Sequence, residues 1–98
     1  MVAIARTADQ VLEDLDARDL LELAKNHART HHVPIGTMVG RDRFSDAVRA
    51  RHTFWKVLHE EHGFSFSAIG RVFGVDHTTV RSALYALADT VPPPPEAA

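Results

Sequence analysis

Apolar residues recur every three or four positions along most of the chain, which is the spacing of one face of an α-helix. No segment alternates apolar and polar residues in the manner of a half-buried β-strand. The pattern therefore predicts an all-α fold, a small helical bundle. It places a helix after Thr7, a second from about Asp16 to His31 and a short helical turn at 35–40. Further helices follow over about 44–62, from Ser65 or Ser67 to Gly74, and over about twelve residues after Asp76.

Caps and helix breakers mark the ends of these helices. Thr7 and Gln10 have the spacing of a capping box, in which each side chain accepts a hydrogen bond from the other residue's amide. Asp16 is placed to cap the second helix, and Pro34 ends it because the residue before a proline resists the α conformation. The remaining ends are marked by Gly63, Ser65 or Ser67, Gly74 and Asp76.

Length and composition restrict the class of protein. The chain has 98 residues, the size of one domain, and no cysteine, which excludes disulfides and thiolate zinc sites. No apolar run approaches the roughly 18 residues of a membrane span, and the N-terminus lacks a signal-peptide core, so we expect a cytoplasmic protein. We divide the chain into an N-terminal helical extension (1–15), a domain (16–90) and a disordered proline-rich tail (91–98).

The net charge of −2 hides an uneven distribution of charged residues. Residues 41–81 contain seven basic and five acidic residues, whereas both flanking segments are net acidic. Local potential rather than total charge attracts an anionic partner, so this middle segment is the candidate region for nucleic acid. A solvated surface of mixed charge is the alternative that the charge pattern alone leaves open.

Phe66–Tyr85 has the residue types of a helix-turn-helix unit. Gly70 is small where the second helix must cross closely, and Gly74 tolerates the positive φ of the turn. Asp76–Thr79 are short and polar, as required at the start of a helix that enters a major groove. The apolar residues that would fill the angle between the helices are Ile69, Phe73, Val75, Val80 and Ala83. On spacing alone, an ordinary three-helix core stays open as an alternative.

The segment Ile69–Val80, IGRVFGVDHTTV, resembles the signature of the C-terminal DNA-binding domain (domain IV) of the bacterial replication initiator DnaA, a Trp-repressor-like helix-turn-helix. The specific part is Asp-His-Thr-Thr-Val. The resemblance covers about residues 16–88, with Arg51-His52 where the family has Arg-Gln, and Ser65–Gly70 where it has Ser-Leu-Pro-Glu-Ile-Gly. The chain departs from the family at the turn, which lacks the family's Gly-Gly-Arg and is one residue shorter.

The resemblance implies a role for each candidate residue. Asp76, His77, Thr78 and Thr79 would read base edges in the major groove, and Arg43 would enter the minor groove. The other matched positions would contact the duplex beside the recognition helix or bind phosphate at a helix N-terminus. These positions are Arg51, His52, Ser65, Phe66, Ser67 and Arg81.

These expectations combine into a function. We expect sequence-specific binding of double-stranded DNA by a non-catalytic, nucleoid-associated regulator or accessory factor in replication or transcription. The alternative is a protein-interaction module that keeps the fold without binding DNA, as a partner or antagonist of the replication machinery. The overall acidity and the short turn favour that alternative, while Arg43, Arg51 and the polar face of the last helix oppose it. A homodimer or a replication-protein partner stays open.

The seven histidines raise the question of a metal site. His27 and His31 are four residues apart on a helix, a spacing that can bind zinc, but no further ligand is evident. His59 and His62 are three apart and do not form the zinc-protease pattern. No serine or cysteine nucleophile is paired with an orienting acid, so we expect no enzyme, no cofactor and no metal.

Overall fold

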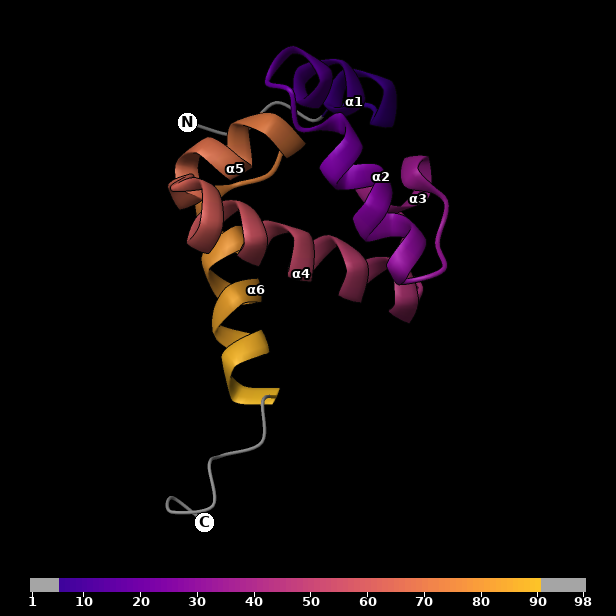
Figure 1. Cartoon of the computed structure of the whole chain (residues 1–98). Helices are drawn as coiled ribbons and strands as arrows, with labels where there is room; N and C mark the ends of the chain where they lie inside the picture. The colour runs from indigo at the N-terminus through magenta and orange to yellow at the C-terminus, as the bar shows by residue number, and fades with distance from the viewer. Residues whose placement is uncertain (1–5, 91–98) are drawn as a thin grey trace.

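The computed structural model describes residues 6–90, and the elements within this range are all α-helices (Figure 1). The helices are α1 (Ala8–Ala17), α2 (Leu21–Thr30), α3 (Ile35–Val39), α4 (Ser45–His62), α5 (Phe66–Phe73) and α6 (His77–Thr90). The predicted all-α class is confirmed. The predicted tail at 91–98 lies outside the described residues.

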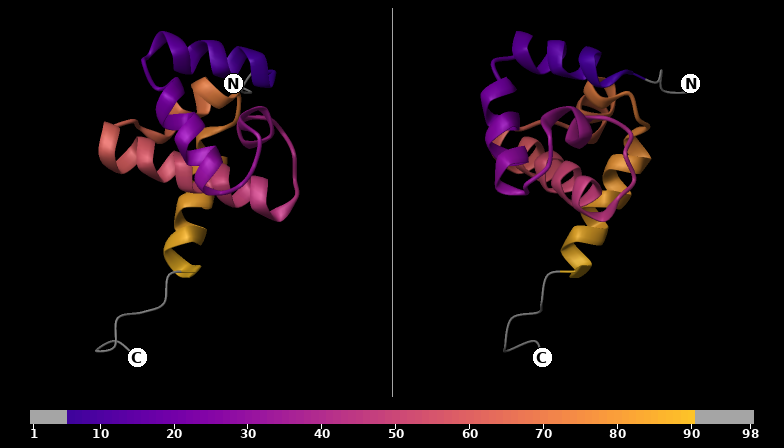
Figure 2. Two further views of the ribbon diagram at one scale, coloured as in Figure 1. Left: turned by 45° about the vertical axis from the view of Figure 1, so that its right-hand side comes forward. Right: turned by 90° about the vertical axis from the view of Figure 1, so that its right-hand side faces the viewer.

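The long helix α4 runs through the middle of the molecule, and α2, α3, α5 and α6 pack against it (Figure 1). α1 lies across the top, where it contacts α2, α3 and α5. α5 and α6 pack against each other and against α4, and the C-terminal part of α6 projects away from the body in all views (Figures 1 and 2). The beginning of α6 is therefore supported by α4 and α5.

The capping box at the start of α1 is confirmed, but the predicted cap at Asp16 is wrong. The hydroxyl of Thr7 accepts from the amide of Gln10, whose side chain accepts from the amide of Thr7. α1 continues past Asp16 to Ala17, and α2 begins after Leu20 without a side-chain cap. The reason is a competing C-terminal motif: Asp19 adopts a φ of 61°, and the amide of Leu20 donates to the carbonyl of Leu15 at 2.8 Å.

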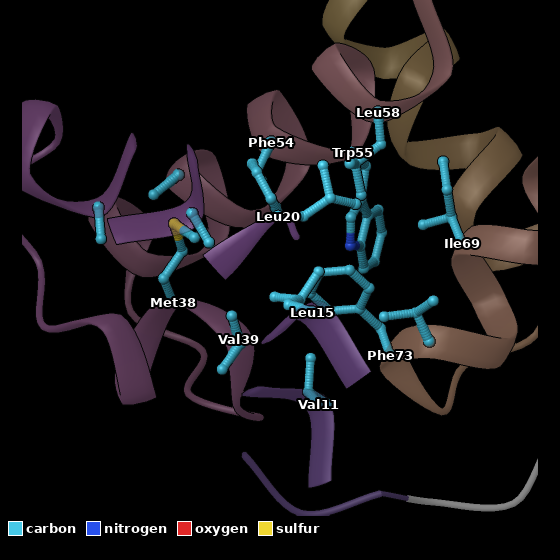
Figure 3. Close-up of a cluster of buried hydrophobic side chains, with 14 of the residues drawn as sticks. Val11, Leu15, Leu20, Met38, Val39, Phe54, Trp55, Leu58, Ile69 and Phe73 are labelled. Carbon is cyan, nitrogen blue, oxygen red and sulfur yellow. The ribbon is translucent and has the colours of Figure 1, made fainter. Parts of the chain in front are cut away.

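Buried side chains from all six helices in the described range form one hydrophobic core (Figure 3). Val11 and Leu15 of α1 are fully buried in this core, so α1 packs as part of the bundle. The predicted boundary between residues 15 and 16 falls inside α1. Trp55 of α4 also lies in the core: only 2% of its surface is exposed, and its ring lies 5.6 Å from that of Phe73.

The indole of Trp55 is packed at a cost in hydrogen bonding. Its Nε1 is buried and has no hydrogen-bond partner among the described residues. Figure 3 shows this nitrogen within the cluster of apolar side chains. A buried donor without a partner costs free energy, so the large apolar area of Trp55 must outweigh that penalty.

Candidate nucleic-acid interface

The corner between α5 and α6 shows the close approach predicted at Gly70 and the positive φ predicted at Gly74. A Cβ added to Gly70 would lie 2.5 Å from the carbonyl oxygen of Val75, so the chain returns too close for any side chain. Gly74 adopts a φ of 71°, and the amide of Val75 donates to the carbonyl of Gly70 at 2.9 Å. Of the predicted wedge residues, Val75 is half-buried and the others are buried: Ile69, Phe73, Val80 and Ala83.

The first turn of α6 faces solvent, as a recognition helix requires. Asp76, His77, Thr78 and Thr79 are all exposed. One carboxylate oxygen of Asp76, Oδ1, accepts from the amide of Thr78 at 2.9 Å and from its hydroxyl at 2.7 Å. These two bonds from Thr78 lower the pKa of Asp76, so the carboxylate is charged at neutral pH. Asp76 thereby caps α6 and holds the Thr78 side chain in place.

Three adjoining hollows connect this turn to α4 and to the loop before it. The first has a volume of about 220 Å³ and brings Arg43, Arg51 and His52 together with Thr79. The second, of about 450 Å³, is lined by His52, Thr78 and Thr79. The third, of about 590 Å³, runs along α4 and α6 and is lined by Arg43 and His52 among others. Five of the predicted site residues therefore share one connected surface.

His52 lies at the centre of this surface because it lines all three hollows. Its ring lies 5.1 Å from that of Trp55, so it rests on the buried indole. Burial lowers the pKa of His52, and the neighbouring Arg51 lowers it further. At neutral pH His52 is therefore uncharged and offers one ring nitrogen as donor and the other as acceptor.

The two predicted arginines of this surface differ in their surroundings. Arg43 is exposed, and no bonded partner for it occurs in the range 6–90. Arg51 is half-buried and donates to backbone: its Nε to the carbonyl of Met38 at 2.8 Å and its Nη2 to that of Asp42 at 2.8 Å. A weaker bond from Nη2 reaches the carbonyl of Thr37 at 3.4 Å.

Ser65, Phe66 and Ser67 form the start of α5 and line none of these three hollows. The hydroxyl of Ser65 accepts from the amide of Ala68 at 3.0 Å, which makes Ser65 the cap that the sequence left undecided between two serines. The ring of Phe66 stacks on His59 with centroids 4.6 Å apart. Arg81 is exposed on α6, outside the three hollows as well.

Among the residues that the sequence analysis missed, Arg41, Arg49 and Ser82 line this surface, and Arg6 binds the end of α5. Arg49 and Ser82 line the hollows, and both are exposed. Arg41 donates from Nη2 to the carbonyl of Gly74 at 3.3 Å, and Arg6 donates to the carbonyls of Arg71 and Val72. The sequence shows that Arg6 and Arg41 are charged, but no local sequence pattern indicates that their side chains bind carbonyls of distant residues.

His27 of α2 and His31, the residue directly after this helix, face α4. Nε2 of His27 and Nε2 of His31 lie 2.7 Å and 3.3 Å from the same hydroxyl, Oγ1 of Thr53. In the described part of the chain, no group of three or more histidine, cysteine, aspartate or glutamate side chains is placed to hold a metal ion. Within the same range, no helix is both long enough and apolar enough to cross a membrane.

The tight corner, the exposed polar start of α6 and the arginines beside it define a DNA-binding helix-turn-helix domain. A family model described as the bacterial dnaA protein helix-turn-helix matches residues 22–86, about two thirds of the chain. The chain therefore belongs to this family of DNA-binding domains. α1 precedes the matched region.

One relative is a full-length initiator. The chain is 29% identical over 69 residues to the chromosomal replication initiator protein DnaA of Mycoplasma pneumoniae. The matched segment is 70% of this chain but only 16% of the relative. No solved structure matches the chain. The chain thus spans only about a sixth of the length of this relative.

Proposed function

We propose that the chain binds double-stranded DNA in a sequence-specific manner, with the start of α6 in the major groove and Arg43 in the adjacent minor groove. The observation that carries this proposal is the exposure of Asp76–Thr79 beside a hollow that Arg43 also lines. An arginine without a bonded partner costs little to redirect toward DNA. The hydrogen bonds between Asp76 and Thr78 order the first turn of α6 before DNA binds, which lowers the conformational entropy lost on binding.

The exposed groups fit base and phosphate chemistry. The second oxygen of Asp76 is free to accept from a cytosine amino group, and the threonine methyl groups can contact a thymine methyl. His77 and Arg81 are both exposed on α6, and their side chains would extend the polar surface toward the duplex. The amides at the start of α5, at Ser65–Ser67, are suited to a backbone phosphate. Arg51 and His52 lie between these elements, beside the path that the DNA strand would take.

The role that fits this domain is a non-catalytic, nucleoid-associated regulator or accessory factor. The relative is named for chromosomal replication initiation, and this chain, whose matched family is a helix-turn-helix, covers 16% of it. A domain of this kind can occupy initiator sites in competition with the initiator, or occupy sites of its own in replication or transcription. A homodimer and a replication-protein partner both remain compatible with this role.

The test is equilibrium binding to two duplexes: one selected by the protein from a random library, and one of random sequence. Affinity for both should fall with salt by roughly 0.9 log units per log of salt for each neutralised phosphate. Thr79→Ala should weaken binding to the selected duplex by about 1–3 kcal/mol, the value of a lost base contact, and leave the random duplex almost unchanged.

Thr30→Ala is the matched control, because Thr30 is an exposed threonine on α2 whose hydroxyl donates within its own helix. It should bind both duplexes like the unmodified chain. If neither duplex binds with salt dependence, the DNA-binding proposal fails. The interaction module, which the acidic net charge favours, would then be the better account.

A further inference from the structure

The α3–α4 loop, residues 40–44, carries Arg43 and is held by two arginines, one on α4 and one within the loop itself. Arg51 of α4 is the larger support. Its guanidinium spans the end of α3 and the loop, with bonds of 2.8 Å to both the Met38 and the Asp42 carbonyls. The carbonyl that it binds inside the loop belongs to the residue directly before Arg43.

Arg51 is bound in a way that only a guanidinium allows. The group is planar and presents five N–H donors in a fixed fork, so one side chain can join carbonyls of different segments. Lysine carries a single ammonium at the end of a flexible chain and cannot reproduce this fork. Arg51 is also half-buried, so part of its surface is turned toward the protein rather than toward a ligand.

Arg41 is the second support of the loop. It lies within the loop, and its Nη2 donates to the carbonyl of Gly74, the residue with positive φ at the corner before α6. The loop is thereby joined to the turn that sets the direction of α6. Thr79 of α6 and Arg43 of the loop line the same hollow.

From these contacts we infer that Arg41 and Arg51 are positioning residues, which fix the separation between Arg43 and the start of α6. The two grooves of a duplex lie at a set spacing, so a loop held at that separation binds without losing the freedom of an unsupported loop. Sequence preference then depends on Arg41 and Arg51, although neither has to touch a base. This inference rests on the proposed DNA binding, which it deepens.

Arg51→Lys separates positioning from direct phosphate contact. Lysine is itself a good phosphate binder, so a direct contact would survive this substitution with little loss. If Arg51 instead positions the loop, the lysine variant cannot join the Met38 and Asp42 carbonyls. Binding to the selected duplex should then weaken by about five- to hundredfold, as for a lost base contact. Arg51→Gln should then be no worse than Arg51→Lys. Arg29→Lys, on the exposed side of α2, is the matched control and should change nothing.

A double-mutant cycle with Arg43→Ala tests whether the effect passes through Arg43. In the Arg43→Ala background, Arg51→Lys and Arg41→Gln should each cause almost no further loss of affinity and no further change in salt slope. If either substitution weakens binding independently of Arg43, or if Arg51→Lys retains the affinity of the unmodified chain, the inference is overturned. Arg41 supplies the second variant, since it makes only one long bond and its loss leaves the core intact.

A measurement on the free protein keeps this inference separate from the proposed function. Backbone ¹⁵N relaxation should show residues 40–44 ordered in the unmodified chain and mobile in Arg51→Lys, with the helices unchanged. If the loop stays equally ordered in Arg51→Lys, the positioning role fails even when DNA binds. If DNA does not bind but the loop loosens as expected, the proposed function fails and the support of the loop stands.

Discussion

Single residues decide whether α5 and α6 can meet at their observed angle. Gly70 shows this most clearly, because its Cα lies against the returning backbone at Val75. Side chains of ordinary size are excluded there by backbone atoms, which cannot rotate away. This requirement was visible in the sequence, since a small residue four positions before a turn glycine is typical of a helix-turn-helix.

Gly70→Ala should destabilise the fold by about 1–3 kcal/mol, because the new methyl group forces the backbone of the turn to move. Gly36→Ala is the matched control: it also lies in a helix, and a Cβ there meets nothing within 4 Å. Alanine at that position should be neutral or stabilising by about 0.5–1 kcal/mol. Urea unfolding of both variants measures the difference, and equal effects would contradict the close approach at the corner.

His27 should make the stability of the fold depend on pH. Burial lowers its pKa below 6.5, the usual pKa of histidine, and the neighbouring His31 lowers it further. A depressed histidine pKa means that the unfolded state binds the proton more tightly. The contribution of neutral His27 is therefore complete above pH 6.5 and decreases as the pH falls below that value.

Urea unfolding at pH values on either side of 6.5 checks this dependence. His27→Gln should reduce the loss of stability on acidification, whereas His32→Gln, at an exposed neighbouring position, should not. A remaining slope is expected from His52, whose pKa is lowered in the same direction. If His27→Gln leaves the pH dependence of the unfolding free energy unchanged, burial of His27 is not the cause of that dependence.

At the scale of helices, periodicity and caps predicted the elements well, and the failures have specific causes. The predicted start of α2 at Asp16 was wrong because the Leu15–Leu20 hydrogen bond and the burial of both leucines extend α1 and close it with a turn. A local cap competes there with a hydrophobic contact that only the folded chain forms. The bonds of Arg41 and Arg51 to backbone carbonyls were equally invisible, since they join segments that periodicity treats separately.

α1 should be required for the stability of the domain even though it precedes the family match. Leu15 is fully buried, so Leu15→Ala should cost about 2–5 kcal/mol of unfolding free energy. Leu12→Ala, a half-buried leucine on the same helix, should cost clearly less. Chemical denaturation measures both. A loss at Leu15 no larger than at Leu12 would mean that α1 is an appendage rather than part of the bundle.

At the scale of the whole molecule, the distribution of charge matters more than its sum. The net charge is −2, yet Arg43 and Arg49 line one hollow between α4 and α6. The sequence could indicate that the middle of the chain is basic, because a count of charges suffices for that. It could not indicate which arginines face the same surface, because that depends on the packing of α4 against α6.

Arg49→Ala should weaken binding of the random and the selected duplex alike and lower the salt slope by roughly 0.9, as for one lost phosphate contact. Arg49 lines the largest hollow of the surface and is exposed. Arg29→Ala removes an exposed arginine from α2 and should leave both slopes unchanged. Titrations at several salt concentrations provide the measurement, and an unchanged slope for Arg49→Ala would place the duplex elsewhere.

The hydrogen bond from the Thr78 hydroxyl to Asp76 also limits which bases can be chosen. While its only hydroxyl proton is engaged, Thr78 presents lone pairs and a methyl group, so it can accept from the amino groups of adenine or cytosine but cannot donate to the O6 or N7 of guanine. In the consensus sequence of duplexes selected by the protein, the base that contacts Thr78 should therefore be adenine or cytosine, which offer an amino hydrogen, or thymine, which offers a methyl group. Recognition of guanine then requires other side chains, whose hydrogen-bond donors are not already engaged.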